Sequence, residues 1–142
     1  MTTSMSEKLF FDTNILFYSF DSSEANKQSI AQELLAHSIS NDQGWISVQV
    51  LGEFFHATVI RQKLMSAQDA EKAVLSLSAL NVMDIDGPLV RSAISLHRKF
   101  ETSYWDSLIL ASAKRCRASK LISEDFNHDQ DYDGVMVVNP FR

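Results

Sequence analysis

Residues 8–20, KLFFDTNILFYSF, indicate the fold class of this chain. A short apolar run ends at Asp12, and apolar residues resume at Ile15 after two polar positions, which is the pattern of a strand that turns directly into a helix. The same alternation continues along the chain. We expect further helices over residues 24–40, 48–63, 67–80, 87–100 and 104–116, and further strands over residues 45–47, 82–85, 120–122 and 135–138. Such an order predicts an α/β domain with a parallel sheet covered on both faces.

The chain has the size and composition of one globular domain. Its 142 residues are 45% hydrophobic and 22% charged, and its four Gly and two Pro leave no room for a long linker. Residues 1–7 lack an apolar segment behind a basic start, so we expect a loose tail rather than a signal peptide. No apolar stretch approaches the ~20 residues that span a bilayer. We therefore expect a single domain over residues 1–142 that acts in the cytoplasm.

The charge and the cysteine content narrow the function. A net charge of −5 argues against a protein that simply coats nucleic acid, because phosphate binding recruits Lys and Arg. It does not argue against a nuclease, since acids that hold divalent cations let the metal meet the phosphate. Cys116 is the single cysteine and cannot form a disulfide within the chain, which fits a reducing compartment. A buried thiol is its simplest interpretation.

Two acids follow strand candidates. Asp12 comes directly after the first strand, and Asp125 stands three residues after the strand at residues 120–122. In open α/β sheets, ligands bind at the carboxyl ends of the strands. Read alone, Asp12 is better explained as the N-cap of the helix that follows. The repeated placement of an acid after a strand is what makes both residues candidates for a site.

Two further acids lie on helices. Glu53 stands at the edge of an apolar helical face, where a carboxylate is costly unless it is paired, metal-bound or turned toward water. Asp106 stands three residues after Ser103, as expected for an acid in the first turn of a capped helix. The continuously apolar residues 108–111 indicate that this helix is largely buried and that its first turn opens onto the edge of the sheet.

Convergence of these acids would require a cation. Four carboxylates from separate segments repel one another unless divalent ions neutralise them. Oxygen ligands of this kind suit Mg²⁺ or Mn²⁺. The predicted metal site consists of Asp12, Glu53, Asp106 and Asp125.

Four segments of the chain carry a resemblance to a known family, and they are FFDTNILFYSFD, VQVLGEFFHA, YWDSLILASA and LISEDFNHDQDYDGVMVVNPF. In order and type they resemble the acidic motifs of PIN-domain ribonucleases, and in particular the toxin half of VapBC-type toxin–antitoxin pairs. The resemblance covers residues Leu9 to Phe141. The resemblance implies a three-layer α/β/α domain with a central parallel sheet of about five strands, usually dimeric. It also implies a Mg²⁺- or Mn²⁺-dependent endoribonuclease that leaves a 5′-phosphate and a 3′-hydroxyl. The implied partner is a small antitoxin whose C-terminal segment covers the acidic cleft.

The resemblance also assigns roles to the acids. It places the three metal-binding acids of the family, and then its more variable fourth, on Asp12, Glu53, Asp106 and Asp125. Asp12 and Asp106 are expected as metal ligands, Glu53 as a ligand or a base that orients water, and Asp125 as a ligand of a second ion. Asn14 matches a polar position that helps to order the first motif. The last motif also holds Glu124, with Asp129 close behind, so the sequence leaves open which acid reaches the metal.

Other patterns in the chain are weaker. The alternating acids of residues 129–134 match the opening of a calcium-binding EF-hand loop, but Pro140 stands where the closing Glu belongs, and we interpret them as a solvated loop. Glu53 and His56 form one E-x-x-H pair, whereas a di-iron bundle needs two. The basic residues between 114 and 120 complement a helix dipole or contact RNA backbone.

Three other functions remain open. A haloacid-dehalogenase-like phosphatase uses a strand-end Asp as its nucleophile, but it carries a second acid two residues on, where this chain has Asn14. A PIN-fold RNA-processing nuclease without a toxin role would use the same acids. A non-catalytic module would use the fold to bind RNA or a protein without turnover.

Overall fold

The computed structural model describes residues 7–142. The loose tail expected at residues 1–7 therefore lies, except for Glu7, outside the described residues. Within residues 7–142, six strands form one sheet in the order β3-β2-β1-β4-β6-β5. The strands are β1 (Leu9–Phe11), β2 (Gly44–Ser47), β3 (Asn81–Met83), β4 (Lys120–Ile122), β5 (Asp131–Tyr132) and β6 (Val135–Val138).

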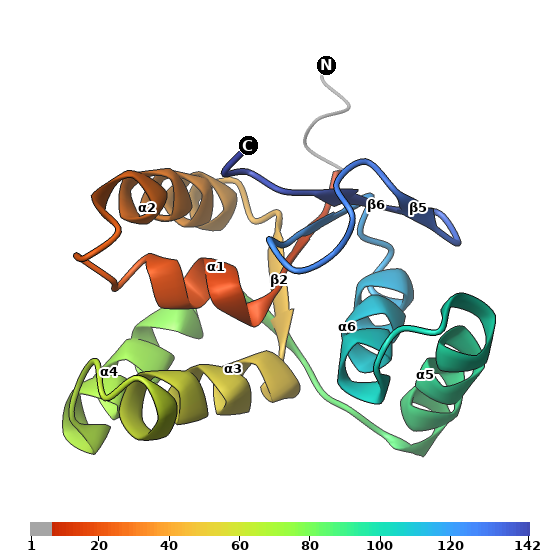
Figure 1. The fold of residues 1–142 in the computed structure, drawn as a ribbon, viewed down its shortest axis with the longest axis horizontal. Helices are drawn as coiled ribbons and strands as arrows, with labels where there is room; N and C mark the ends of the chain where they lie inside the picture. The colour runs from red at the N-terminus through yellow and green to blue at the C-terminus, as the bar shows by residue number, and fades with distance from the viewer. Residues whose placement is uncertain (1–6) are drawn as a thin grey trace.

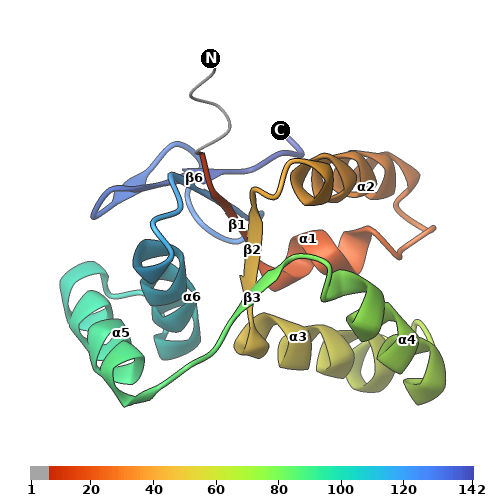
Figure 2. The ribbon, with the colours of Figure 1, turned by 180° about the vertical axis from the view of Figure 1, so that it is seen from behind.

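Helices cover the sheet on both sides. Helices α1 to α4 lie on one side, and α5 and α6 lie on the other (Figures 1 and 2). Among the described residues, no helix is both long and apolar enough to cross a membrane. The helices are α1 (Thr13–Tyr18), α2 (Ala25–Ser40), α3 (Val48–Phe55), the π-helix η2 (His56–Arg61), α4 (Ala67–Leu77), α5 (Gly87–Phe100) and α6 (Tyr104–Arg115).

The centre of the sheet is parallel. β1 pairs in parallel with β2 and β4, which in turn pair in parallel with β3 and β6. Phe10 and Phe11 on β1 are both fully buried, as expected for a strand covered on its two faces. Asp12 caps α1 directly after β1, and Ser47 caps α3 as the last residue of β2. Two helices therefore begin side by side at the carboxyl edge of the sheet.

Residues 129–134 were expected to form a solvated loop. Two of them instead form strand β5, which pairs with β6 in an antiparallel hairpin. Asp133 and Gly134 both have positive φ, 55° and 97°, as the tightest hairpin turns require. Tyr132 is buried, with its ring 5.1 Å from that of Phe100 and 5.7 Å from that of Phe126. Burial of this aromatic side chain holds the short strand against the core.

The helix expected over residues 48–63 is divided. α3 is followed by the π-helix η2, in which the chain makes hydrogen bonds to carbonyls five residues back. The N–H of Gln62, for example, donates to the carbonyl of Ala57 at 2.9 Å. Thr58 Oγ1 donates to the carbonyl of Phe54 at 2.8 Å and competes there with the regular backbone ladder. π-Helical turns are frequent at functional sites.

The end of α6 agrees with the sequence-based expectations. Cys116 is buried, and burial raises the pKa of its thiol. Lys114 and Arg115 lie in the last turn of α6, as expected of residues that complement the helix dipole. They also form ion pairs, Lys114 with Asp133 at 3.2 Å and Arg115 with Asp86 at 2.9 Å.

Candidate active site

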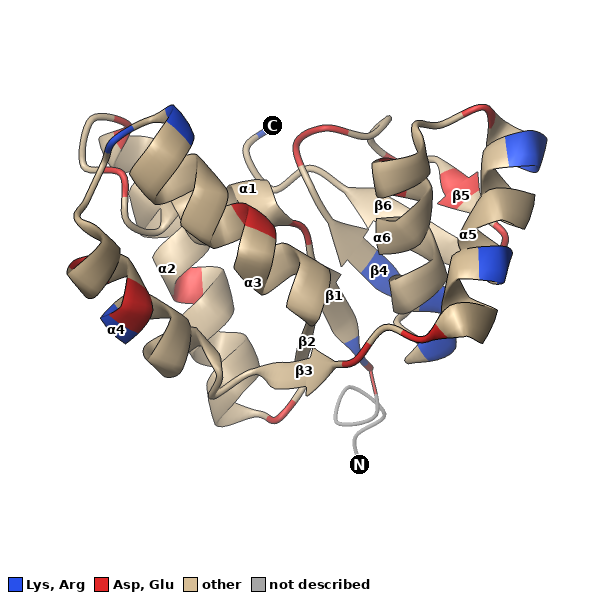
Figure 3. Ribbon diagram, turned by 90° about the horizontal axis from the view of Figure 1, so that it is seen from below, with Lys and Arg blue, Asp and Glu red and all other residues tan. Residues whose placement is uncertain are grey.

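A cavity of about 920 Å³ opens at the carboxyl edge of the sheet. Its walls come from α1, α3, η2, the first turn of α6 and the loop that follows β4. Figure 3 shows this side of the molecule, with acidic positions on α3 and on the neighbouring loops. The structure brings the four predicted acids onto these walls together with Asn14, the acids being Asp12, Glu53, Asp106 and Asp125.

Asp12 is buried and both of its carboxylate oxygens are hydrogen-bonded. Its Oδ1 accepts the backbone N–H of Thr13 at 2.8 Å, which makes it the N-cap of α1. Its Oδ2 accepts the hydroxyl of Ser123 at 2.7 Å and lies 3.5 Å from the amide nitrogen of Asn14. Asp12 is therefore the cap of α1, as the sequence predicted, and it also lines the cavity.

The environment of Asp12 disfavours its charged form. Burial raises the pKa of Asp12 to about 7, and the hydrogen bonds from Ser123 and Thr13 offset only part of this effect. The negative charges of Asp125 and Asp106 raise the pKa further. A carboxylate in this position is stabilised by an added cation.

Glu53 is held on both oxygens by neutral donors. Thr13 Oγ1 donates to Oε1 at 2.7 Å, and Gln49 Nε2 donates to Oε2 at 3.1 Å. Gln49 Nε2 also donates to the carbonyl of Trp105 at 3.1 Å, so it connects α3 to the first turn of α6. None of the ion pairs within residues 7–142 involves Glu53. Hydrogen bonds therefore hold the Glu53 carboxylate at the cavity, and it has no cationic partner among the described residues.

Asp106, in the first turn of α6, and Asp125, in the loop after β4, both line the cavity. The backbone N–H of Asp106 donates to the Ser103 hydroxyl at 3.1 Å, which confirms the predicted helix cap. Burial raises the pKa of Asp106, and so does the charge of Asp125, followed by that of Glu53. Asp125 is exposed, and its Oδ2 accepts the amide of Asn14 at 3.0 Å.

The donor set fits a hydrated divalent cation. Within residues 7–142, no three acidic, histidine or cysteine side chains lie close enough together to ligate one metal ion directly. Mg²⁺, however, keeps several of its waters and is usually bound through one or two carboxylates. The available donors are carboxylate oxygens, and the pKa of Asp12 and Asp106 is raised by burial first and by the charges of neighbouring acids in addition. Such all-oxygen sites suit Mg²⁺ or Mn²⁺ rather than softer metals.

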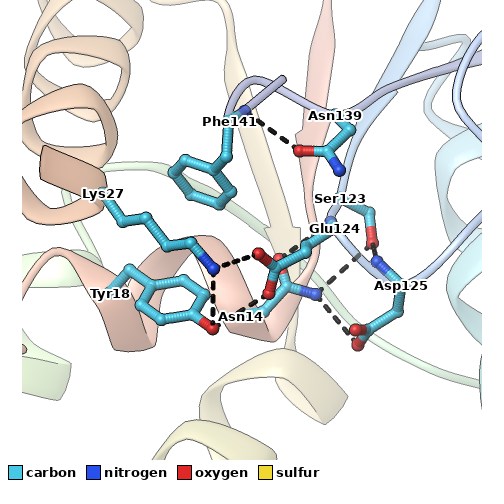
Figure 4. Close-up of polar contacts among 8 residues, drawn as sticks. All are labelled: Asn14, Tyr18, Lys27, Ser123, Glu124, Asp125, Asn139 and Phe141. Carbon is cyan, nitrogen blue, oxygen red and sulfur yellow. Dashed lines mark hydrogen bonds and ion pairs between the residues drawn. The ribbon is translucent and has the colours of Figure 1, made fainter. Parts of the chain in front are cut away.

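The three candidates for the fourth acid, Glu124, Asp125 and Asp129, lie in different surroundings. Glu124 accepts hydrogen bonds from Tyr18 at 2.9 Å and from Lys27 at 2.5 Å (Figure 4). Asp129 is exposed and pairs with His128 at 3.3 Å, away from the cavity walls. Of the three carboxylates, only that of Asp125 accepts a hydrogen bond from the Asn14 side chain. This contact favours Asp125 as the fourth acid.

Several residues at the cavity escaped the sequence analysis. Gln49 stands four residues before Glu53 on one helix, so its contact could have been found from helical spacing. Trp105 lines the cavity beside Asp106 and is 61% exposed, which is unusual for so large an aromatic side chain. Ser123 has no such signal, because its partner Asp12 is 111 residues away in the sequence.

Comparison with known proteins identifies the family. The family model described as PIN domain matches residues 9–131. The chain belongs to the PIN domain family. The family predicted from the four acidic motifs is therefore confirmed. The predicted α/β fold is also confirmed. Its mostly parallel sheet has six strands, where about five were expected. No curated protein matches the chain in sequence.

Solved structures share this PIN fold. A chain of a toxin–antitoxin complex from Klebsiella pneumoniae has a TM-score of 0.69 at 22% identity, over 94% of this chain and 98% of that chain. VapC20 from Mycobacterium tuberculosis, described as a sarcin–ricin loop cleaving toxin, has a TM-score of 0.62 at 18% identity, over 83% and 90%. A chain of DNA-bound VapBC from Salmonella typhimurium has a TM-score of 0.69 at 16% identity, over 92% and 96%. At these identities the likeness shows a common fold.

Proposed function

We propose that this chain is a Mg²⁺- or Mn²⁺-dependent endoribonuclease that hydrolyses phosphodiester bonds in RNA. The proposal is carried by one observation, which is that Asp12, Glu53, Asp106 and Asp125 all line the same cavity. Membership of the PIN family supports it, because these residues stand in the acidic motifs by which the chain resembles PIN-domain ribonucleases.

Each acid has a distinct role in this proposal. Asp12 and Asp106 would hold the metal ion, and Asp125 would hold a second one. A divalent cation bound there lowers the pKa of a water and stabilises charge on the attacked phosphate. Glu53 would orient the water and accept its proton, since Thr13 and Gln49 fix both of its oxygens while leaving lone pairs free. The expected products carry a 5′-phosphate and a 3′-hydroxyl.

The cavity walls also suit single-stranded RNA. The exposed ring of Trp105 lies next to Asp106, where an unpaired base can stack on it. Arg61 and His56 line the wall formed by η2 and can contact phosphate oxygens. The likeness in fold to VapC20, which is described as a sarcin–ricin loop cleaving toxin, supports the same substrate class.

The experiment that tests the function is cleavage of single-stranded RNA with the metal added and removed. We expect cleavage in Mg²⁺ or Mn²⁺, loss of cleavage in EDTA, and recovery when excess Mn²⁺ is restored. Cleavage that persists in EDTA, or products that end in a 2′,3′-cyclic phosphate, would contradict metal-dependent hydrolysis. RNA binding without turnover in any metal would favour a non-catalytic module.

The phosphatase alternative is disfavoured by Asn14. Haloacid-dehalogenase-like phosphatases need a second acid at this position. Here the Asn14 amide donates to Asp125 at 3.0 Å and lies 3.5 Å from Asp12 Oδ2. An ionised acid cannot donate either bond. Trapping of a phospho-aspartate would be required to revive this alternative.

We also propose that the chain is the toxin of a type II toxin–antitoxin pair, acts in the cytoplasm and forms a homodimer. Support comes from the similar folds of chains in toxin–antitoxin complexes. The discriminating observation is a short reading frame for a DNA-binding protein directly beside this gene. Its absence would leave an RNA-processing nuclease without the toxin role.

A further inference from the structure

The loop after β4 is attached to helix α2 by a partly exposed ion pair. Lys27 on α2 donates to Glu124 Oε2 at 2.5 Å, although the two residues are 97 positions apart in the sequence. The Tyr18 hydroxyl donates to the other oxygen, Oε1, at 2.9 Å. Both oxygens of Glu124 are thus occupied on the side away from Asp125 (Figure 4).

The ammonium group of Lys27 is also enclosed by aromatic rings. Its Nζ lies 4.6 Å from the ring centroid of Tyr18 and 5.5 Å from that of Phe141. These two rings contact each other edge to face at 5.3 Å. The Phe141 N–H donates to Asn139 Oδ1 at 2.9 Å, which orders the backbone just after β6. Cation–π contacts of this kind restrict a side chain that is otherwise very flexible.

A short relay of hydrogen bonds leads from Glu124 to the acids of the cavity. The backbone N–H of Glu124 donates to Asn14 Oδ1 at 3.2 Å. Because this bond sets which way the Asn14 amide faces, its nitrogen is directed to Asp125 Oδ2 at 3.0 Å. The N–H of Asp125 donates to Ser123 Oγ at 3.0 Å, and that hydroxyl donates to Asp12 Oδ2 at 2.7 Å. Displacement of Glu124 therefore moves donors to two of the candidate metal ligands.

The charge of Lys27 matters for a second reason. Glu124 lines the same cavity as the four candidate acids. Without Lys27 its carboxylate would add an unneutralised negative charge next to Asp125. Such a charge would compete for the cation and alter the arrangement of the other carboxylates. In the structure, Lys27 instead neutralises this carboxylate.

We propose that Lys27 is a positioning residue for RNA cleavage, which through Glu124 holds the loop after β4 so that Asn14 and Asp125 keep their places at the metal site. This inference rests on the proposed function. Partly exposed ion pairs contribute little to stability, and the two side chains here are 29% and 26% exposed. Variants of the pair should therefore stay folded, and their effects should be seen at the site.

The test compares Lys27→Met, which keeps the aliphatic stem, with Lys27→Arg, which keeps the charge. We expect Lys27→Met to lower kcat for RNA cleavage by about 10- to 100-fold, since small displacements in an active site have effects of this size. KM for RNA should change less than about twofold, because the RNA-contacting wall is untouched. Mn²⁺ alone, measured by its electron paramagnetic resonance signal, should bind more weakly. Lys27→Arg should recover most of both properties.

Two controls separate positioning from general damage. Lys72 is an exposed lysine on α4, and Lys72→Met should leave kcat, Mn²⁺ affinity and melting temperature unchanged. Lys27→Met combined with Glu124→Gln should be no worse than the more damaged single variant, because both changes break one interaction. Full additivity of the two losses would overturn the proposed route through Glu124.

The outcomes are distinguishable from failure of the proposed function. Unchanged kcat and unchanged Mn²⁺ affinity in Lys27→Met would overturn the positioning role. A kcat loss that only parallels a large fall in melting temperature, without rescue by Lys27→Arg, would also overturn it. If the wild-type chain cleaves no RNA, the proposed nuclease function fails, and Mn²⁺ affinity alone decides whether Lys27 positions the acids.

Discussion

Asp12→Asn is expected to slow metal-dependent RNA cleavage by roughly 10³-fold while raising the melting temperature of the metal-free protein. Loss of one metal-binding carboxylate removes several kcal/mol of transition-state stabilisation, which corresponds to a rate loss of roughly 10³-fold. Asparagine has the same shape, and its oxygen can still accept the N–H of Thr13 that caps α1. The variant should therefore fold, so the loss of activity can be assigned to the site.

The stabilising effect follows from the pKa of Asp12. Burial raises this pKa from 3.8 to about 7. The folded protein then holds the proton more tightly than the unfolded chain, so its stability falls as the pH rises from about 4 to about 7. Above pH 7 the ionised side chain costs on the order of 4 kcal/mol, which asparagine avoids. The variant also loses hydrogen bonds, which offsets part of this gain. We therefore expect Asp12→Asn to melt roughly 5 °C above the wild type in EDTA at pH 8.

Calorimetry at two pH values checks this prediction. The difference in melting temperature between wild type and Asp12→Asn should be large at pH 8 and should nearly vanish at pH 4, where both side chains are uncharged. A variant that melts lower than wild type at pH 8 in EDTA would show that Asp12 is stabilised by something other than an added cation. Retained cleavage would remove Asp12 from the proposed mechanism.

The affinity for Mn²⁺ is expected to fall by about tenfold for each pH unit below 7. A metal ion must displace the proton from Asp12, whose pKa is about 7, so proton and metal compete for one carboxylate. Asp106, whose pKa is also raised by burial and by the charge of Asp125, adds to the dependence. Titration calorimetry with Mn²⁺ between pH 5.5 and 8 measures the slope.

The Asp12→Asn variant is the control for this slope. It lacks the competing proton at position 12, so its weaker Mn²⁺ affinity should vary much less over the same pH range. Equal slopes in the two proteins would place the competing proton elsewhere. An affinity of the wild type that is independent of pH would contradict a role of Asp12 as a metal ligand.

Local patterns predicted most of the fold. Apolar periodicity and caps located the strands and helices within a few residues, because both depend only on neighbours within about four positions. The exceptions also have local causes. The Asp133–Gly134 pair is a strong hairpin signal, but the acids around it favoured the interpretation as a solvated loop. Burial of Tyr132 holds β5 in place. In the π-helical turn, the Thr58 hydroxyl donates to the carbonyl of Phe54, a contact that apolar periodicity does not report.

The candidate site was only partly predictable. The order of the acidic motifs pointed to four carboxylates, and the structure places all four on one cavity. The sequence could not decide between Glu124 and Asp125, since the two are adjacent and chemically alike. Lys27, 97 residues earlier, engages Glu124, while Asn14 engages Asp125.

The α/β fold class, the family and the acids that line the cavity could all be read from the amino-acid order, because short-range periodicity and motif order are local properties of the chain. How those acids are held became visible only in the folded protein. The Thr13 bond to Glu53 spans 40 residues, and the Ser123 bond to Asp12 spans 111. Contacts over such distances arise only when the parallel strands bring their carboxyl ends to one edge of the sheet, so no local pattern reports them.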